Sequence, residues 1–341
     1  MKIAITGGAG FIGSNLARAY LDAGHDVLVI DSLVSGSREA VDRRARFHQM
    51  DIRDTRLQAL LQMERPDIVS HHAAGRESFL PGGQPLADAD VNVRGLLNVL
   101  DSCVGASVSK IIFASGGNTL YGCVESEQLP LTETAALCPR RPHDISKVAG
   151  EWYVRYYTQQ YGLTHTILRY ADVFGEPAIE QAQHPLTHFI HMLLQEQHPI
   201  IRGAAEEVRD HIYIDDVVQA NLCALERGRN QTLHISSGQG HTLKQIYRAA
   251  AHLLRSEIEP VYVSNSLVEA SSIVLDNALA QHVLRWHPEF SFTEGVQHAI
   301  ERFQGSTEPA GVVAMVNVGT AHSADQFIAP RKREMAIMGA Q

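Results

Sequence analysis

The sequence has few cysteines, no run of basic residues and no apolar stretch long enough to cross a bilayer. Its four cysteines show no Cys-x-x-Cys spacing, which argues against a secreted disulfide scaffold and favours reduced thiols. Against 38 Asp and Glu stand only 29 Lys and Arg, a net charge of −9, so we expect no nucleic-acid and no membrane partner. The strand-like start over residues 2–6 does not resemble a signal peptide, and we therefore expect a cytoplasmic protein.

Short β-branched runs alternate with helical patterns through the first half of the chain. Of the 341 residues 45% are hydrophobic, which is enough to form a buried core. Alternating strands and helices predict an α/β fold with a Rossmann-type, doubly wound parallel sheet. The strands are expected at 2–6, 26–31, 46–50, 67–73, 110–115 and 164–169.

This alternation ends after about residue 175, which indicates a second structural region. We expect a Rossmann domain over residues 1–175, to which 208–237 returns, and a smaller C-terminal α/β region over 176–304. The tail over 305–341 is expected to be an extension, either a surface segment or an arm that contacts a dimer partner.

A glycine-rich loop lies between the first strand and the first helix. Gly7, Gly10 and Gly13 have the spacing that allows a tight turn, close approach of a pyrophosphate, and packing of the helix on the strand. Asp31 ends the second strand, where an acidic side chain accepts hydrogen bonds from the adenosine ribose and repels a 2′-phosphate. The loop therefore predicts NAD rather than NADP; the alternative for Asp31 is a turn residue.

Further motifs follow along the chain: DIRD at 51–54, HHAAG at 71–75, DVNVRG at 90–95, SK at 146–147 and RDHIYI at 209–214. Together with TGGAGFIGSNLA at 6–17 they resemble the extended short-chain dehydrogenase/reductase family, in particular its NAD-dependent nucleotide-sugar epimerases and dehydratases. The resemblance covers about residues 1–303 and implies an NAD-binding domain followed by a substrate-binding region. It implies cofactor contacts from Gly7, Gly10, Phe11, Ile12, Gly13, Asp31, Asp51, Ile52, Ala73, Ala74, Asn92, Lys147 and Tyr170.

The sequence departs from this family at the catalytic pair. Such enzymes use Tyr-x-x-x-Lys, in which the lysine lowers the phenol pKa and the phenolate takes a hydroxyl proton while hydride passes from C4 to nicotinamide. Lys147 is present here, but His143 replaces the tyrosine. A neutral imidazole can accept the proton, and a nearby lysine favours the neutral form. The alternative is a histidine at the start of a helix with no role in proton transfer.

A second departure concerns the residues before Tyr121. Where relatives place a Ser or Thr four residues earlier, this chain has Gly117, and Ser115 and Thr119 are the candidates to replace that hydroxyl. Sugar dehydratases need an Asp-Glu pair at the positions of Asn118 and Thr119, and related decarboxylases carry Glu at the second position. Both reactions are therefore disfavoured.

The substrate side gives opposing signals. Asp172 stands where relatives have an Asn that touches the substrate, and a carboxylate there repels a diphosphate. Arg209 matches the arginine that grips the substrate's phosphates. His184, His188 and His191 have helical spacing but no carboxylate partner, so we expect a solvated helix face and no metal.

These observations predict an NAD-dependent, epimerase-like enzyme that transfers hydride transiently at C4 of a nucleotide sugar or a related small molecule. The alternatives are an oxidoreductase or isomerase acting on another substrate, and a non-catalytic NAD-binding protein. A homodimer is expected because helices over 89–103 and 144–161 resemble those of the family's intersubunit four-helix bundle. Their apolar stripes, which would otherwise face the sheet, comprise Leu96, Leu97, Val99 and Leu100 on one helix and Val148, Trp152 and Tyr156 on the other.

Overall fold

A parallel β-sheet organises the first half of the chain and confirms the predicted α/β class. The computed structural model describes residues 1–75, 84–175, 184–202, 206–263 and 272–305. Within them, all neighbouring strands of the largest sheet pair in parallel, as a doubly wound fold requires. The strand order is β10 (Gln231–Ile235), β6 (Thr164–Tyr170), β5 (Lys110–Gly116), β4 (Ile68–His71), β1 (Lys2–Thr6), β2 (Asp26–Asp31) and β3 (Arg46–Gln49).

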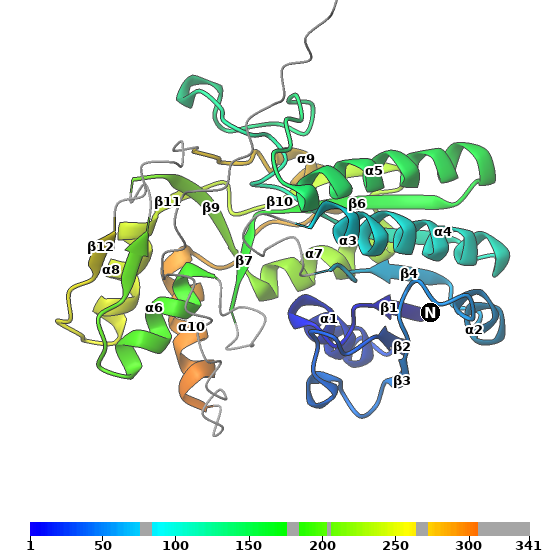
Figure 1. Cartoon of the computed structure of the whole chain (residues 1–341), viewed down its shortest axis with the longest axis horizontal. Helices are drawn as coiled ribbons and strands as arrows, with labels where there is room; N and C mark the ends of the chain where they lie inside the picture. The colour runs from blue at the N-terminus through cyan, green and yellow to red at the C-terminus, as the bar shows by residue number, and fades with distance from the viewer. Residues whose placement is uncertain (76–83, 176–183, 203–205, 264–271, 306–341) are drawn as a thin grey trace, which may run out of the picture. The chain divides into compact units, whose positions relative to one another are not determined.

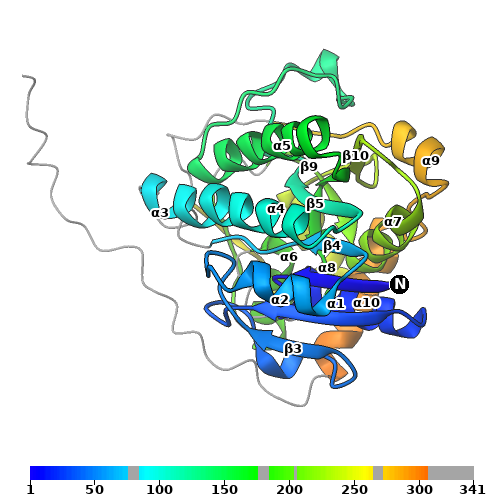
Figure 2. The ribbon, with the colours of Figure 1, turned by 90° about the vertical axis from the view of Figure 1, so that its right-hand side faces the viewer.

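Helices cover both faces of this sheet. Alternate side chains of a strand point to opposite faces, so each strand contributes to the core on both sides. Ile3 and Ile5 pack with the helices of one face, whereas Ala4 packs with those of the other. The views in Figures 1 and 2 show α5, α4 and α2 side by side along one face. The helices are α1 (Phe11–Asp22) and α7 (Ile214–Glu226) on the first face, and α2 (Leu57–Glu64), α4 (Leu96–Gly105) and α5 (Pro142–Tyr161) on the second.

The helix expected over 89–103 consists of three segments. Helix α3 (Pro85–Ala89) continues into a π-helical stretch (Asp90–Gly95) and then into α4. A π-helical stretch inside a helix shifts the side-chain register and is frequent at functional sites. In α4 the side chains of Leu96, Val99 and Leu100 are completely buried against the sheet. For these three residues the stripe therefore faces the protein's own core.

The second half of the chain builds a smaller region and also returns to the sheet, through α7 and β10. Figure 1 shows α6, α8 and α10 gathered beside β7, β9 and β11, apart from the strands β1 to β4. No described helix is both long and apolar enough to cross a membrane. The remaining elements are β7 (Asp172–Phe174), α6 (Pro185–Leu194), β8 (Ile200–Arg202), β9 (Val208–Tyr213), β11 (Gly240–Thr242), α8 (Leu243–Leu253), β12 (Val261–Val263), α9 (Ala278–Leu284) and α10 (Phe292–Gly305), with 3-10 turns at Arg38–Ala40 and Ser126–Gln128. The expected extension beyond residue 305 lies outside the described residues.

Candidate active site

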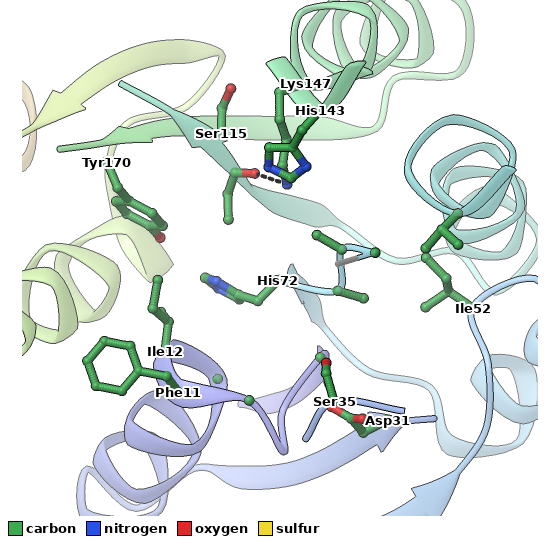
Figure 3. Close-up of a pocket in the computed structure, with 18 of the residues that line it drawn as sticks. Phe11, Ile12, Asp31, Ser35, Ile52, His72, Ser115, His143, Lys147 and Tyr170 are labelled. Atoms are coloured by element: carbon green, nitrogen blue, oxygen red, sulfur yellow. Dashed lines mark hydrogen bonds between the residues drawn. The ribbon is translucent and has the colours of Figure 1, made fainter. Parts of the chain in front are cut away.

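A cavity of about 480 Å³ lies at the carboxyl edge of the sheet, where parallel strands of such folds bind their ligands. Figure 3 shows the glycine loop and Asp31 on one side and the start of α5 on the other. Three predicted site residues, Asn92, Thr119 and Arg209, are not among those that line this cavity. The predicted residues that do line it are Gly7, Gly10, Phe11, Ile12, Gly13, Asp31, Asp51, Ile52, Ala73, Ala74, Ser115, His143, Lys147, Tyr170 and Asp172.

The glycine loop forms a cradle that only glycine permits. Gly7 has a φ of +73°, and a β-carbon there would lie 2.5 Å from the backbone nitrogen of Ala73. A β-carbon on Gly13 would lie 2.2 Å from the backbone oxygen of Gly7. No described side chain caps the N-terminus of α1, which begins at Phe11 beside the cavity. A helix N-terminus with a glycine loop before it fits the pyrophosphate of a dinucleotide.

Asp31 is held rigidly at the adenosine end of this cradle. Its Oδ2 accepts a hydrogen bond of 2.9 Å from the backbone N–H of Ala9, and its Oδ1 accepts one of 2.8 Å from Leu33. Asp51 lines the same end, where the Arg53 guanidinium hydrogen-bonds its carboxylate and lowers its pKa. The loop and the fixed Asp31 carboxylate thus fit NAD, with acceptors placed for ribose hydroxyls.

His143 and Lys147 occupy the opposite wall, one helical turn apart at the start of α5 (Figure 3). Lys147 is 8% exposed, and its Nζ donates a hydrogen bond of 2.9 Å to the backbone oxygen of Ala114. Burial lowers the pKa of Lys147 to about 8, an effect that the carboxylates of Asp88 and Glu151 oppose. Burial also lowers the pKa of His143; Asp88 opposes this and Lys147 adds to it. His143 is therefore neutral at neutral pH and able to accept a proton.

Of the two candidate hydroxyls only Ser115 lines the cavity. Its Oγ donates a hydrogen bond of 2.7 Å to Glu151, a fully buried carboxylate that also binds the guanidinium of Arg169 at 2.6 Å. Thr119 lies outside the lining, beside Gly116. At Gly117 a β-carbon would come within 2.5 Å of the backbone oxygen of Tyr170, so this backbone has no room there for the hydroxyl residue of relatives.

Asp172 and Arg209 lie on neighbouring strands, β7 and β9. The Arg209 Nη1 is 3.8 Å from the Asp172 Oδ2, and its Nη2 is 2.7 Å from the Glu207 Oε1. Two carboxylates thus surround the one arginine that the resemblance assigns to phosphate binding. This arrangement weakens the attraction of Arg209 for an anion.

Three residues of the site went unrecognised as functional in the sequence. Asp88 is fully buried, with its Oδ2 3.8 Å from the His143 Nδ1. His72 lines the cavity, stacked on Tyr170, and burial together with Lys147 lowers its pKa to about 3. The solvated face expected for His184 is wrong, because its ring also lines the cavity with a buried Nε2. Only the position of His72 at a strand end pointed to the site, since the other two are placed by tertiary packing.

Metal binding was not expected, and the described residues contain no group of three or more His, Cys, Asp or Glu that could hold a metal ion. The three histidines at 184, 188 and 191 run along α6 from its N-cap to its last turn, and only His184 lines the cavity.

Comparison with known proteins agrees with this geometry. Residues 3–236 match the NAD dependent epimerase/dehydratase family. UDP-glucose 4-epimerase of Lacticaseibacillus casei is 32% identical over 313 residues, covering 85% of this chain and 92% of the relative. The structure of UDP-glucose 4-epimerase with UDP-glucose from Thermotoga maritima has a TM-score of 0.85 and 34% identity, covering 90% of this chain and 100% of the other. The UDP-glucose 4-epimerase of Thermus thermophilus, solved in complex with NAD, has a TM-score of 0.83 and 30% identity, with the same coverage.

These similarities confirm the predicted family, the NAD cofactor and the epimerase-like class of enzyme. The glycine cradle and Asp31 account physically for the cofactor, and the seven-stranded sheet accounts for the structural match. The chain therefore belongs to the NAD-dependent epimerase/dehydratase family.

Proposed function

We propose that this protein interconverts the C4 epimers of a nucleotide sugar, with His143 as the proton acceptor in place of a tyrosine. The observation that carries the proposal is that His143 and Lys147 line the same cavity as the dinucleotide cradle, one helical turn apart. The relative from Thermotoga maritima, solved with UDP-glucose, supports the substrate class.

In this proposal each residue has a definite task. NAD, held by the glycine cradle and Asp31, would supply the acceptor for the C4 hydride of the sugar and the donor for its return to the opposite face. The His143 imidazole takes the proton of the C4 hydroxyl and returns it in the reverse step. Burial and, to a lesser extent, the charge of Lys147 keep the resting imidazole neutral, and Lys147 is held in position by its bond to the Ala114 oxygen. Ser115, held by Glu151, is the hydroxyl available to the sugar.

A less anionic substrate is the second candidate, and the surroundings of Arg209 favour it. Glu207 and Asp172 place two negative charges around this single guanidinium, which leaves little net attraction for a diphosphate. Glu207→Gln and Asp172→Asn distinguish the candidates. If the substrate is a UDP-sugar, both changes should strengthen its binding; if the substrate is uncharged, both should leave its binding nearly unchanged.

The decisive experiment combines purified protein, NAD and a panel of nucleotide sugars, and follows the absorbance of reduced nicotinamide together with C4 epimerisation. His143→Phe should abolish turnover while leaving NAD affinity nearly unchanged, because the imidazole is absent from the cradle. His252→Phe, on the exposed side of α8, is the matched control and should behave like the unmodified protein. Full activity of His143→Phe would assign the proton acceptor to another group. Failure of every sugar to reduce the cofactor would favour the non-catalytic alternative.

We also propose a homodimer formed through the outer face of α5. Ile145, Trp152 and Tyr156 are 53%, 65% and 48% exposed and follow one another along one side of that helix. Large apolar side chains gathered on one helix face mark an interaction surface. Sedimentation should show a dimer that Trp152→Glu dissociates and that Met63→Glu, a change at another exposed apolar residue, does not. A monomer at micromolar concentration would exclude this proposal.

The cytoplasm is the location that we propose, because all four cysteines are free thiols.

A further inference from the structure

Asp88 is a completely buried carboxylate beside the proposed base. It lies on α3, which ends just before the π-helical stretch. Its Oδ1 accepts a hydrogen bond from the Ser146 hydroxyl, and its Oδ2 accepts one of 2.9 Å from the Asn92 Nδ2. Both of these donors are neutral, and the charge of the carboxylate acts on Lys147 as well as on His143. The His143 Nδ1 lies 3.8 Å from Oδ2.

The neighbours of Nδ1 decide which nitrogen of His143 carries the proton. Asn92 is fixed in orientation, because its Oδ1 accepts a hydrogen bond of 2.9 Å from the backbone N–H of Gly75. Its amide nitrogen therefore faces both Asp88 and the His143 Nδ1, which is 3.5 Å away. An amide donor favours an unprotonated Nδ1, whereas a carboxylate favours Nδ1–H. At such similar distances a full negative charge outweighs a neutral dipole.

We propose that Asp88 is the positioning residue of this site: it holds the proton of His143 on Nδ1, so that Nε2 is left as the acceptor for the substrate's hydroxyl proton. This inference rests on the proposed role of His143 as the base. An acidic group that orients a base from behind is the arrangement found where histidine activates a hydroxyl in other enzymes. Asp88 then also stabilises the imidazolium that forms when the proton is taken up.

The charged groups around His143 give the expected direction of its titration. Burial and Lys147 lower the pKa of His143, whereas Asp88 from α3 and Asp144 from the same helix raise it. Loss of the Asp88 carboxylate should therefore lower the pKa of the imidazole further. It should also lower the pKa of Lys147, which Asp88 raises.

The test uses the NAD-loaded protein labelled with ¹⁵N-histidine, with His143→Phe to assign the signal. In the unmodified protein Nδ1 should be protonated and Nε2 unprotonated. In Asp88→Asn the imidazole should titrate at lower pH, and kcat should fall about 10- to 100-fold with little change in KM, since part of the general-base contribution is lost. Ser146→Ala is the control, because it removes a bond to the other carboxylate oxygen and should leave tautomer and titration unchanged.

Each outcome decides between a positioning role and a structural one. A protonated Nε2 in the unmodified protein would overturn the pairing without any variant, so the proposal stays testable even if Asp88→Asn fails to fold. A folded Asp88→Asn protein with lower activity but an unchanged tautomer and titration would also overturn it. If the spectra agree and yet no nucleotide sugar is converted, the pairing stands and the proposed function fails.

Discussion

Replacing His211 with Phe tests how buried histidines make this protein sensitive to acid. His211 lies on β9, is 2% exposed, and neither of its ring nitrogens has a hydrogen-bond partner among the described residues. Burial lowers its pKa to about 3, against about 6.5 in the unfolded chain. The unfolded state therefore binds more protons between these values, and the free energy of unfolding falls as the pH drops below about 6.5. At about pH 5.5 the loss due to this one histidine is about 1.4 kcal/mol.

The assay is urea unfolding of both proteins at about pH 7.5 and pH 5.5. Removing two unpartnered buried nitrogens gains about 1–3 kcal/mol, while the larger phenyl ring costs a similar amount. These packing effects are equal at both pH values, so the difference between the two pH values isolates the proton. The loss of stability on acidification should be about 1.4 kcal/mol smaller in His211→Phe. His252→Phe, at an exposed position, should leave the loss unchanged. Equal losses in His211→Phe and the unmodified protein would refute the reasoning.

Further predictions follow from the loop, the buried ion pair and the base. Gly13→Ala should weaken NAD binding by about 100-fold in calorimetry, equivalent to about 3 kcal/mol, because its β-carbon would lie 2.2 Å from a backbone oxygen of the loop. Glu151→Leu should cost about 3–5 kcal/mol in urea unfolding by leaving the buried Arg169 unpaired, whereas Glu151→Leu with Arg169→Met should cost much less; additive losses would contradict this. His143→Tyr alone should retain little epimerase activity, since a phenolate would face the Asp88 carboxylate. Adding Asp88→Asn should raise the rate, and a lower rate in the double variant than in His143→Tyr would count against the pairing.

The sequence was sufficient for the parts of the molecule that depend on local patterns. The glycine spacing and the acidic end of the second strand predicted the cradle, because a tight turn and a close backbone approach require glycine wherever the chain lies. Alternating strands and helices predicted the parallel sheet. The spacing of four residues between His143 and Lys147 predicted that they would lie together, since residues four apart share a helix face.

Other features depend on packing between distant segments. Asp88 carries no local signal, and only the packing of α3 against α5 brings it beside His143. The apolar stripe at Leu96, Val99 and Leu100 was compatible with a subunit interface and with a core face, and the structure buries it against the sheet. The spacing of His184 predicted a solvated helix face. As the N-cap residue of α6, however, its Nδ1 accepts a hydrogen bond from the backbone N–H of Leu186, and its ring lines the cavity.

The replacement of tyrosine by histidine changes the charge balance of the site, and this explains why a carboxylate is needed beside it. A phenolate and a lysine cation neutralise each other before the proton moves. A neutral imidazole beside Lys147 instead becomes a second cation when it takes the proton, on a side chain that is mostly buried. An imidazolium 3.8 Å from Asp88 gains about 4 kcal/mol at an effective dielectric constant of about 20, which opposes the repulsion from the lysine. Glu151 contributes less, because Arg169 already pairs with it. Histidine chemistry at position 143 therefore depends on the fold bringing Asp88 to this point.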